Sequence, residues 1–301
     1  MQERLCKRDY AREIMQEQAA LEPTLMTNTL DILYQDEALV VINKPAGMMT
    51  HRSRIAEDDE PSAMELLRDQ LGSWVYPIHR LDRATSGALI FGLDQDNARV
   101  LHESLAQGQV QKTYWAITRG HAPKEQLIDR ALKEKRDRIT DKKAQLDKAP
   151  QEARTLVQTL AHLTLPVELG RYPSARFSLV EVKPLTGRRH QIRRHLAGIN
   201  YPLIGDTTHG RGEQNRFFRT HFNSYRLLLA AVNLKFTHPI TAKVLDINAP
   251  LSGEMADFCR RYFFQGDQVL KTELIQEELG LQSQCLCLKD LSDLGHLLPS
   301  S

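Results

Sequence analysis

A short polar loop leads directly into an apolar run near residue 90. The loop, residues 79–87, carries one carboxylate, Asp82, between Arg80 and Arg83. The run that follows, Ala88–Leu93, contains no charged residue and is typical of a buried β-strand. A carboxylate at the end of a core strand, with cations beside it, stays ionised at neutral pH. We therefore expect Asp82 to stand at the edge of a sheet, available as a nucleophile or a base.

Short apolar and alternating runs recur along the chain, with helical patterns between some of them. The predicted strands are residues 30–34, 39–42, 88–93, 114–117, 177–182, 227–232 and 234–236. Three helices are predicted: residues 62–72, which open on a capping box, 96–108, which Asp96 would cap, and 188–196, which Gly198 closes. Because strands occur both as neighbours and with helices between them, we predict an α+β domain. Its sheet should be mixed and largely antiparallel, with flanking helices.

Composition divides the chain into three parts. Residues 1–28 are charged and weakly helical, and residues 265–301 are acidic with apolar residues at helical spacing. We expect an N-terminal extension (1–28), one folded domain (29–264) and a helical C-terminal tail (265–301). Within the domain, residues 129–150 are highly charged and lack apolar periodicity, which predicts a solvated insertion or loop.

The overall composition excludes several classes of protein. Hydrophobic residues make up 41% and charged residues 26%, as in an ordinary globular protein. No segment reaches the ~20 apolar residues that cross a bilayer. The N-terminus has no apolar core of a secretory signal, so we expect a cytoplasmic protein without membrane association. The cysteines have neither disulfide nor metal-site spacing, and we expect free thiols at Cys6, Cys259, Cys285 and Cys287.

A second informative stretch is basic, although the net charge of the chain is only +2. Residues 171–195 hold seven Lys or Arg against one acid, Glu181. Such concentrated positive charge gives salt-sensitive phosphate binding. In the predicted helix Ile192 and Leu196 face the core, and Arg193 borders that buried side, where it could pair with Asp82. From composition alone, a solvated basic helix without an assigned role is an equally good interpretation.

The two stretches resemble motifs of the RluA family of RNA pseudouridine synthases. Residues 79–87 fit the pattern H-R-L-D-x-x-T-S-G, and residues 186–195 fit T-G-R-x-H-Q-I-R-x-H. Residues 112–114 fit a third motif, K-x-Y, although a tyrosine in a strand is usually only part of the core. The resemblance covers about residues 30–263. It implies the pseudouridine synthase fold, with the catalytic domain at residues 29–264.

The resemblance also implies a set of site residues. Asp82 would be the catalytic carboxylate, Arg193 its ion-pair partner, and Tyr114 a ring that stacks on the target base and takes part in proton transfer. The substrate-binding residues would be His79, Arg80, Arg83, Thr85, Arg188, His190, Gln191 and Ile192. Arg80 is the residue expected to help open the RNA. The reaction would need neither a metal nor a small-molecule cofactor.

Two narrower stretches, residues 170–173 and 205–216, are similar to those of family members that modify uridine 65 of tRNA. They imply tRNA as the partner of a monomeric enzyme that isomerises uridine to pseudouridine. Attack of Asp82 on the sugar C1′ and elimination to a glycal remain open as routes.

Three alternatives to this interpretation remain. The chain could be a pseudouridine synthase for ribosomal RNA. It could be an RNA-binding module in which Asp82 is only structural. It could also be a metal-dependent nuclease that uses Asp82 and His79. That chemistry needs clustered carboxylates, and near Asp82 the sequence offers only Asp94 and Asp96.

Overall fold

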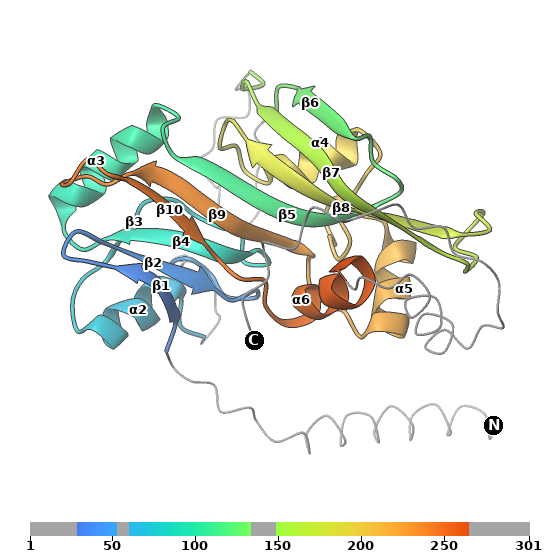
Figure 1. Ribbon diagram of the computed structural model, residues 1–301, viewed down its shortest axis with the longest axis horizontal. Helices are drawn as coiled ribbons and strands as arrows, with labels where there is room; N and C mark the ends of the chain where they lie inside the picture. Colours follow the sequence, from blue (N-terminus) through green and yellow to red (C-terminus); the bar gives the residue numbers. More distant parts are fainter. Residues whose placement is uncertain (1–28, 53–59, 134–148, 265–301) are drawn as a thin grey trace, which may run out of the picture.

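A single ten-stranded sheet forms the centre of the computed structural model, which describes residues 29–52, 60–133 and 149–264 (Figure 1). The strands are β1 (Asp31–Gln35), β2 (Leu39–Lys44), β3 (Tyr76–Pro77), β4 (Ser86–Gly92), β5 (Gln111–Arg119), β6 (Glu125–Asp129), β7 (Arg154–Leu165), β8 (Ala175–Pro184), β9 (Leu229–Thr237) and β10 (Val244–Asn248). The helices are α2 (Ala63–Leu71), α3 (Gln95–Ala106), α4 (Gln191–Gly198), α5 (Gly212–Phe222) and α6 (Gly253–Cys259), which continues into a π-helical turn (Arg260–Phe264).

The sheet is mixed, and nearly all of its contacts are antiparallel. Its order is β1-β2-β4-β9-β5-β8-β7-β6, with β10 against β9 and β3 against β4. Among the described strands only β4 and β9 pair in parallel. The predicted α+β class with a largely antiparallel sheet is therefore confirmed.

The parallel junction between β4 and β9 requires a glycine. Ser86 is in register with Ala230, and Gly87 with Ala231. Gly87 has φ +109°, and a Cβ there would lie 2.1 Å from the Ala231 carbonyl oxygen. Only a residue without a side chain permits this approach. The glycine that ends the 79–87 loop thus allows a late strand to join the centre of the sheet.

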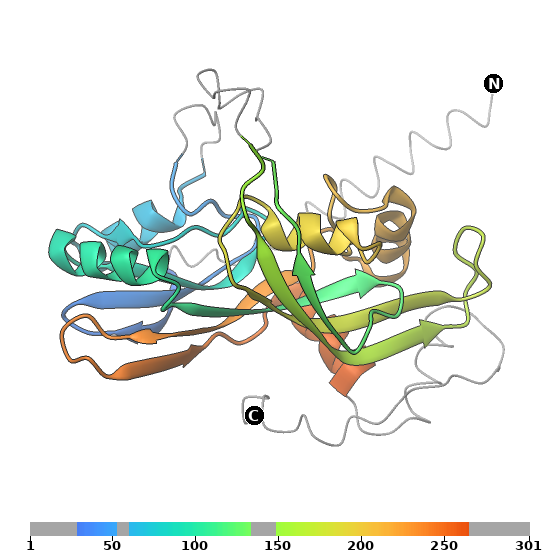
Figure 2. The same ribbon diagram turned by 90° about the horizontal axis from the view of Figure 1, so that it is seen from above.

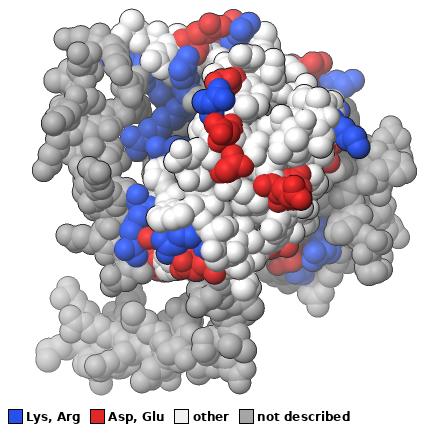
Figure 3. Space-filling view, turned by 90° about the vertical axis from the view of Figure 1, so that its left-hand side faces the viewer, with Lys and Arg blue, Asp and Glu red and all other residues white. Residues whose placement is uncertain are grey.

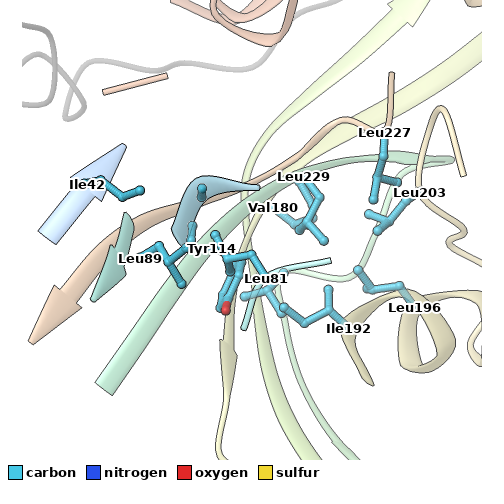
Figure 4. Close-up of a cluster of buried hydrophobic side chains, with 14 of the residues drawn as sticks. Ile42, Leu81, Leu89, Tyr114, Val180, Ile192, Leu196, Leu203, Leu227 and Leu229 are labelled. Atoms are coloured by element: carbon cyan, nitrogen blue, oxygen red, sulfur yellow. The ribbon is translucent and has the colours of Figure 1, made fainter. Parts of the chain in front are cut away.

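The core lies on both faces of the sheet. On one face, α2 and α4 pack through Leu67 and Leu196 against residues of β2, β4, β5, β8 and β9. Figure 4 shows part of this cluster, in which the Tyr114 ring lies beside Leu81 and Ile192. The other face holds two clusters, one with α3 and one with α5 and α6. Figure 2 shows α4 and α6 on opposite sides of the sheet.

Several local predictions need correction. The second helix is capped by Asp94, whose side chain accepts from the Asn97 amide, and not by Asp96. Strands β6, β7 and β10 and helices α5 and α6 were not predicted. The stretch 129–150 is not a loop throughout, because Leu132 and Gln151 bridge and so extend the β6–β7 hairpin. The predicted strands at 227–232 and 234–236 are one strand, β9.

Other predictions fall on residues that the structure does not describe. The N-terminal extension (1–28), the C-terminal tail (265–301), and Cys6, Cys285 and Cys287 lie outside the described residues. Cys259 is buried, with a free thiol. In the described part of the chain, no helix has the length and apolar character that a membrane span needs.

Candidate active site

Asp82 lies in a turn that a neighbouring segment holds in place. The Thr85 amide closes the turn by donating to the Asp82 carbonyl oxygen at 2.9 Å. The buried Thr50 hydroxyl accepts from the Leu81 amide and donates to the Leu81 carbonyl oxygen, both at 3.2 Å. The chain then enters β4, whose residues are all buried. As predicted, the carboxylate stands beside the start of a core strand.

The fully buried Lys44 joins this turn to the preceding loop. Its ammonium donates to the carbonyl oxygens of Pro45 and Met48, both at 2.7 Å, and to that of Arg83 at 3.4 Å. Burial lowers the pKa of Lys44 to about 7, and the positive charge of Arg226 acts in the same direction. Lys44 therefore stabilises the Asp82 turn from inside the protein.

Helix α4 brings Arg193 to the Asp82 carboxylate. Arg193 Nη1 donates to Asp82 Oδ2 at 3.1 Å. Its Nε and Nη2 donate to Oδ2 and Oδ1 of Asp206 at 2.7 and 2.8 Å. Asp206 Oδ1 also accepts from the Thr208 and His209 amides, each at 2.9 Å. Burial alone would raise the pKa of Asp206, but Arg193 and the two amides lower it below its ordinary value. Asp206 thus fixes the guanidinium that reaches Asp82.

His190 is a second neighbour of Asp82. Its Nε2 lies 3.8 Å from Asp82 Oδ2, and its Nδ1 lies 3.2 Å from His209 Nε2. Burial lowers the pKa of His190, and the negative charge of Asp82 partly opposes that shift. The lowered pKa favours a neutral His190 ring beside the carboxylate at neutral pH.

Helix α4 begins at Gln191, three residues later than predicted. His190 has φ 52°, a left-handed conformation that interrupts helical geometry. The Gln191 side-chain oxygen accepts from the Arg188 amide and from the Thr186 hydroxyl, at 3.0 and 2.7 Å. Arg189 therefore precedes the helix. Arg193 itself is 7% exposed, as its predicted position beside the core requires.

A cavity of about 800 Å³ lies beside Asp82. This volume is within the range of small-ligand sites, so it can hold one nucleotide. The end of α3, the start of β5 and the β8–α4 connection form its walls. The predicted site residues that line it are His79, Arg80, Asp82, Thr85, Tyr114, Arg188, His190, Gln191, Ile192 and Arg193.

One predicted site residue, Arg83, does not line the cavity. Its Nε donates to the Gly47 carbonyl oxygen at 2.7 Å, and its Nη2 lies 3.6 Å from Glu60. Gln191 lines the cavity but already uses its amide within the protein. In addition to its contacts at Thr186 and Arg188, its Nε2 donates to the Arg154 carbonyl and the Thr155 hydroxyl, both at 2.9 Å. The geometry favours a structural role for both side chains.

Burial changes the proton affinity of two further cavity residues. It raises the pKa of the Tyr114 phenol, and the charge of Asp82 adds to this shift. Tyr114 therefore keeps its proton at neutral pH. Burial lowers the pKa of His79 to about 3, so its ring is neutral, and its Nε2 is buried without a hydrogen-bond partner. Among the described residues, no three His, Cys, Asp or Glu side chains lie together as metal ligands would.

Sequence reasoning did not find the roles of Asp206, His209 and Lys44. Lys112 and Lys183 also line the cavity and were not proposed as site residues. Asp206 and His209 lie within the 205–216 stretch that carried the narrower resemblance. That position was their only signal, because their contacts depend on the folded geometry.

Charge is unevenly distributed over the surface. Figure 3 shows one end of the molecule, where Lys and Arg gather in two groups at the left and acidic side chains lie across the middle. A nearly neutral protein can therefore still present basic areas to a polyanion.

Residues 38–198 match the family described as RNA pseudouridylate synthase. The chain belongs to this family. A protein from Vibrio parahaemolyticus named tRNA pseudouridine synthase C is 44% identical over 77% of this chain and 95% of its own length. Proteins of the same name from Vibrio cholerae and Pasteurella multocida are 47% and 48% identical, over 74% and 76% of this chain and 91% and 94% of theirs.

Solved structures support the same fold. Human RNA Pseudouridylate Synthase Domain Containing 1 superposes with a TM-score of 0.59 at 23% identity, over 83% of this chain and 95% of that one. Human RNA Pseudouridylate Synthase Domain Containing 4 gives 0.58 at 25% identity, over 76% and 92%. This pseudouridine synthase thus has its family's fold, as the RluA-type motifs predicted.

Proposed function

We propose that this enzyme isomerises uridine to pseudouridine in tRNA, at uridine 65, with Asp82 as the nucleophile. The observation that carries the proposal is the Asp82–Arg193–Asp206 arrangement beside a cavity of nucleotide size. The names of relatives at 44–48% identity support tRNA as the substrate. The motifs at 170–173 and 205–216 support uridine 65.

In the reaction, Asp82 supplies negative charge at the sugar. A carboxylate oxygen attacks C1′ as the bond from C1′ to N1 of the base breaks, and the electron pair of that bond leaves with the uracil. The uracil then turns, C5 bonds to C1′, and the Asp82 oxygen departs. The glycal route would use the same carboxylate to take part in elimination. In both routes Arg193 keeps the carboxylate oriented toward the cavity.

Tyr114 is proposed to stack on the uracil and to transfer a proton. The proton on C5 must leave and N1 must gain one before the product forms. Because Tyr114 keeps its proton at neutral pH, it can give that proton to N1 as it accepts one from C5. Its ring lies at the cavity wall and can replace part of the stacking that the base loses.

Arg80 is proposed to help the uridine leave its helix. The side chain is exposed and lines the cavity, two residues before Asp82. A guanidinium there can fill the vacated stack or bind a flanking phosphate. Arg80→Ala should reduce turnover of a paired uridine far more than that of a single-stranded one. Equal losses on both substrates would argue against this role.

The catalytic domain is proposed to span residues 29–264. The family resemblance begins near Leu30, so removal of residues 1–28 should leave turnover unchanged. A loss of turnover in that shortened chain would assign the first segment a part in catalysis or RNA binding.

The first test is the release of tritium from C5-labelled uridine in tRNA. The parent enzyme should release it, and Asp82→Asn, which keeps the shape but removes the anion, should lower the rate by roughly 10³-fold or more. Its affinity for tRNA should change little. Substantial turnover by the variant would remove Asp82 from the nucleophile role, and no release by the parent would indicate an RNA-binding protein without this activity.

The second test concerns the position. Chemical mapping of RNA from cells that lack the protein should show an unmodified uridine 65 in tRNA. Intact pseudouridine at that position would refute the assignment, and a change confined to ribosomal RNA would replace it with the ribosomal alternative.

A further inference from the structure

A second concave site lies outside the large cavity. It has a volume of about 220 Å³, and it is formed by the end of β5, the β7–β8 turn, the segment after α4 and the start of α5. Arg119, Tyr172 and Arg176 are among the side chains that line it. None of them belongs to the arrangement around Asp82.

Three guanidinium groups surround the Tyr172 ring. The Cζ atoms of Arg119, Arg171 and Arg176 lie 5.5, 5.2 and 5.8 Å from the ring centroid. The negative face of an aromatic ring attracts cations at these distances. Arg171 also donates to the Tyr172 hydroxyl at 3.1 Å, and Arg171 and Arg119 lower the pKa of Tyr172. Tyr172 thus gathers three positive charges that would otherwise repel one another.

The three arginines lie outside the ion pairs that the described residues form. Within the described part of the chain, none of the ion pairs includes Arg119, Arg171 or Arg176. Glu213 lies close to Gly170 but forms no ion pair with the three arginines. Arginines that are held together without an acid present planar donors to an anion with several oxygens. A phosphate group is one such anion.

The turn that carries Tyr172 is closed by its own backbone. The Leu169 amide donates to the Tyr172 carbonyl oxygen at 3.0 Å, and the Tyr172 amide donates to the Leu169 carbonyl oxygen at 3.3 Å. Just after β5, the Gly120 amide donates to the Arg176 carbonyl oxygen of β8 at 2.6 Å. The backbone positions of the arginines are therefore fixed before any ligand arrives.

The site is linked to the large cavity by two elements. Strand β5 carries Tyr114 at the cavity and ends with Arg119, about 17 Å further along at the usual rise per residue of a strand. Helix α4 carries Arg193 and leads to Asn200 at the smaller site. A few nucleotides of one RNA strand span such a distance. The volume is below the usual range for whole small-molecule ligands and suits a single phosphate group with part of its sugar.

We propose that this site, which we call the Tyr172 cleft, binds a phosphodiester of the RNA whose uridine enters the large cavity. The inference rests on the proposed function, because it assumes an RNA substrate. The cleft contacts the RNA backbone at a fixed distance from Asp82. It thereby selects uridines that have an RNA strand extending toward the cleft, and it carries no base readout of its own.

The test compares a double variant with a matched control. Arg119→Gln with Arg176→Gln removes two charges from the cleft at similar side-chain size. Arg99→Gln with Arg260→Gln removes two charges from exposed arginines that pair with Glu103 and Asp257. The measurements are the Kd for tRNA over a range of salt concentrations and the single-turnover rate at saturating enzyme. Thermal unfolding verifies that each variant folds.

The cleft variant should bind tRNA about tenfold more weakly. The slope of its log Kd against log salt concentration should be smaller by about one unit. Its single-turnover rate at saturation should stay within about twofold of the parent rate, since no group at Asp82 is changed. The control should match the parent in Kd, in the salt slope and in the single-turnover rate. A short stem that holds the uridine but lacks the backbone reaching the cleft should be bound equally by all three proteins.

The outcomes separate this inference from the proposed function. A parent enzyme that releases no tritium from labelled uridine would refute the proposed function, whatever the variants do. An active parent together with an unchanged Kd and slope in the cleft variant would refute the cleft alone. The parent could also bind inorganic phosphate, and the cleft variant could lose that binding while its tRNA affinity stays the same. This result would indicate a site for free anions and would also overturn the inference. If the double variant does not fold, Arg176→Gln, at an exposed position, gives the same comparison.

Discussion

Arg193 forms ion pairs with two carboxylates of the site. It binds Asp206, whose side chain is 1% exposed, through two nitrogens, and Asp82, which is 30% exposed, through one. Asp206 therefore holds the guanidinium, and Asp82 remains open to the cavity. The sequence predicted the pair with Asp82 from a motif. It did not predict the stronger pair with Asp206, because no local pattern links a helix residue to the loop that follows the helix.

Arg193→Ala should lower the free energy of unfolding by about 3–5 kcal/mol, because it leaves a buried carboxylate without its partner. That carboxylate is Asp206, because the Asp82 side chain is partly exposed. Asp82→Asn should cost less than about 1 kcal/mol, since its side chain is partly exposed. Urea denaturation measures both. Equal losses in the two variants would mean that Arg193 stabilises the fold mainly through Asp82.

Tyr114→Phe keeps the ring in the core and removes only the hydroxyl. RNA binding should stay within about twofold of the parent, and formation of pseudouridine should fall by about 10²-fold or more, as expected for loss of an acid–base group. Single-turnover analysis of the RNA checks this, with nucleoside composition read at successive times. A variant as fast as the parent would leave Tyr114 with stacking alone.

At the scale of elements, prediction succeeded where the signal is local. Helix α2 has the predicted capping box, with Ser62 and Glu65 bonded reciprocally, and ends at Gly72 in a left-handed conformation. Strand β7 was missed although its buried residues largely alternate with more exposed ones. Its threonines, glutamine and histidine weaken the apolar pattern, and its long pairing with β8 supplies the stability that the local sequence does not indicate.

Gly87→Ala should prevent the close approach of β9 to β4, since the new Cβ would overlap the Ala231 carbonyl oxygen. We expect a loss of stability above about 3 kcal/mol or a failure to fold. Gly108→Ala is the matched control, because Gly108 has φ +74° with no atom within 4 Å of a new Cβ. It should cost only the ~1–2 kcal/mol of left-handed backbone strain. Thermal unfolding compares the two variants. Similar losses of stability would mean that backbone strain, and not overlap with Ala231, accounts for the effect of Gly87→Ala.

Lys44 should make the stability of the two joined loops depend on pH. Its folded pKa of about 7 lies below the ordinary value of 10.5, so between these values the unfolded chain binds more protons. Stability should therefore rise with pH from about 7 to about 10 and level off below 7. Lys44→Met removes this contribution. Denaturation of both proteins at several pH values should give a difference that grows with pH, and parallel curves would exclude titration of Lys44.

At the scale of the whole molecule, the nearly neutral net charge conceals basic areas (Figure 3). Because these areas should bind phosphates, the Kd for tRNA should rise steeply with salt, with a log–log slope of several units. Filter binding at increasing salt concentrations measures the slope. A Kd that is nearly independent of salt would mean that contacts within the cavity dominate recognition.

The position of β9 between β4 and β5 has a consequence for how the chain acquires its structure during synthesis. β4 and β5 follow one another closely in sequence but do not pair with each other. Both pair with β9, which is synthesised much later. The Arg226 contact with Ser86 closes the same junction across 140 residues. Loop closure over such a separation slows folding and leaves β5, which is buried from Tyr114 to Thr118, without a partner strand on one edge. A chain that stops before Leu229 therefore lacks the strand that pairs with both β4 and β5. The edge of β5 that β9 would cover is then exposed and prone to aggregation.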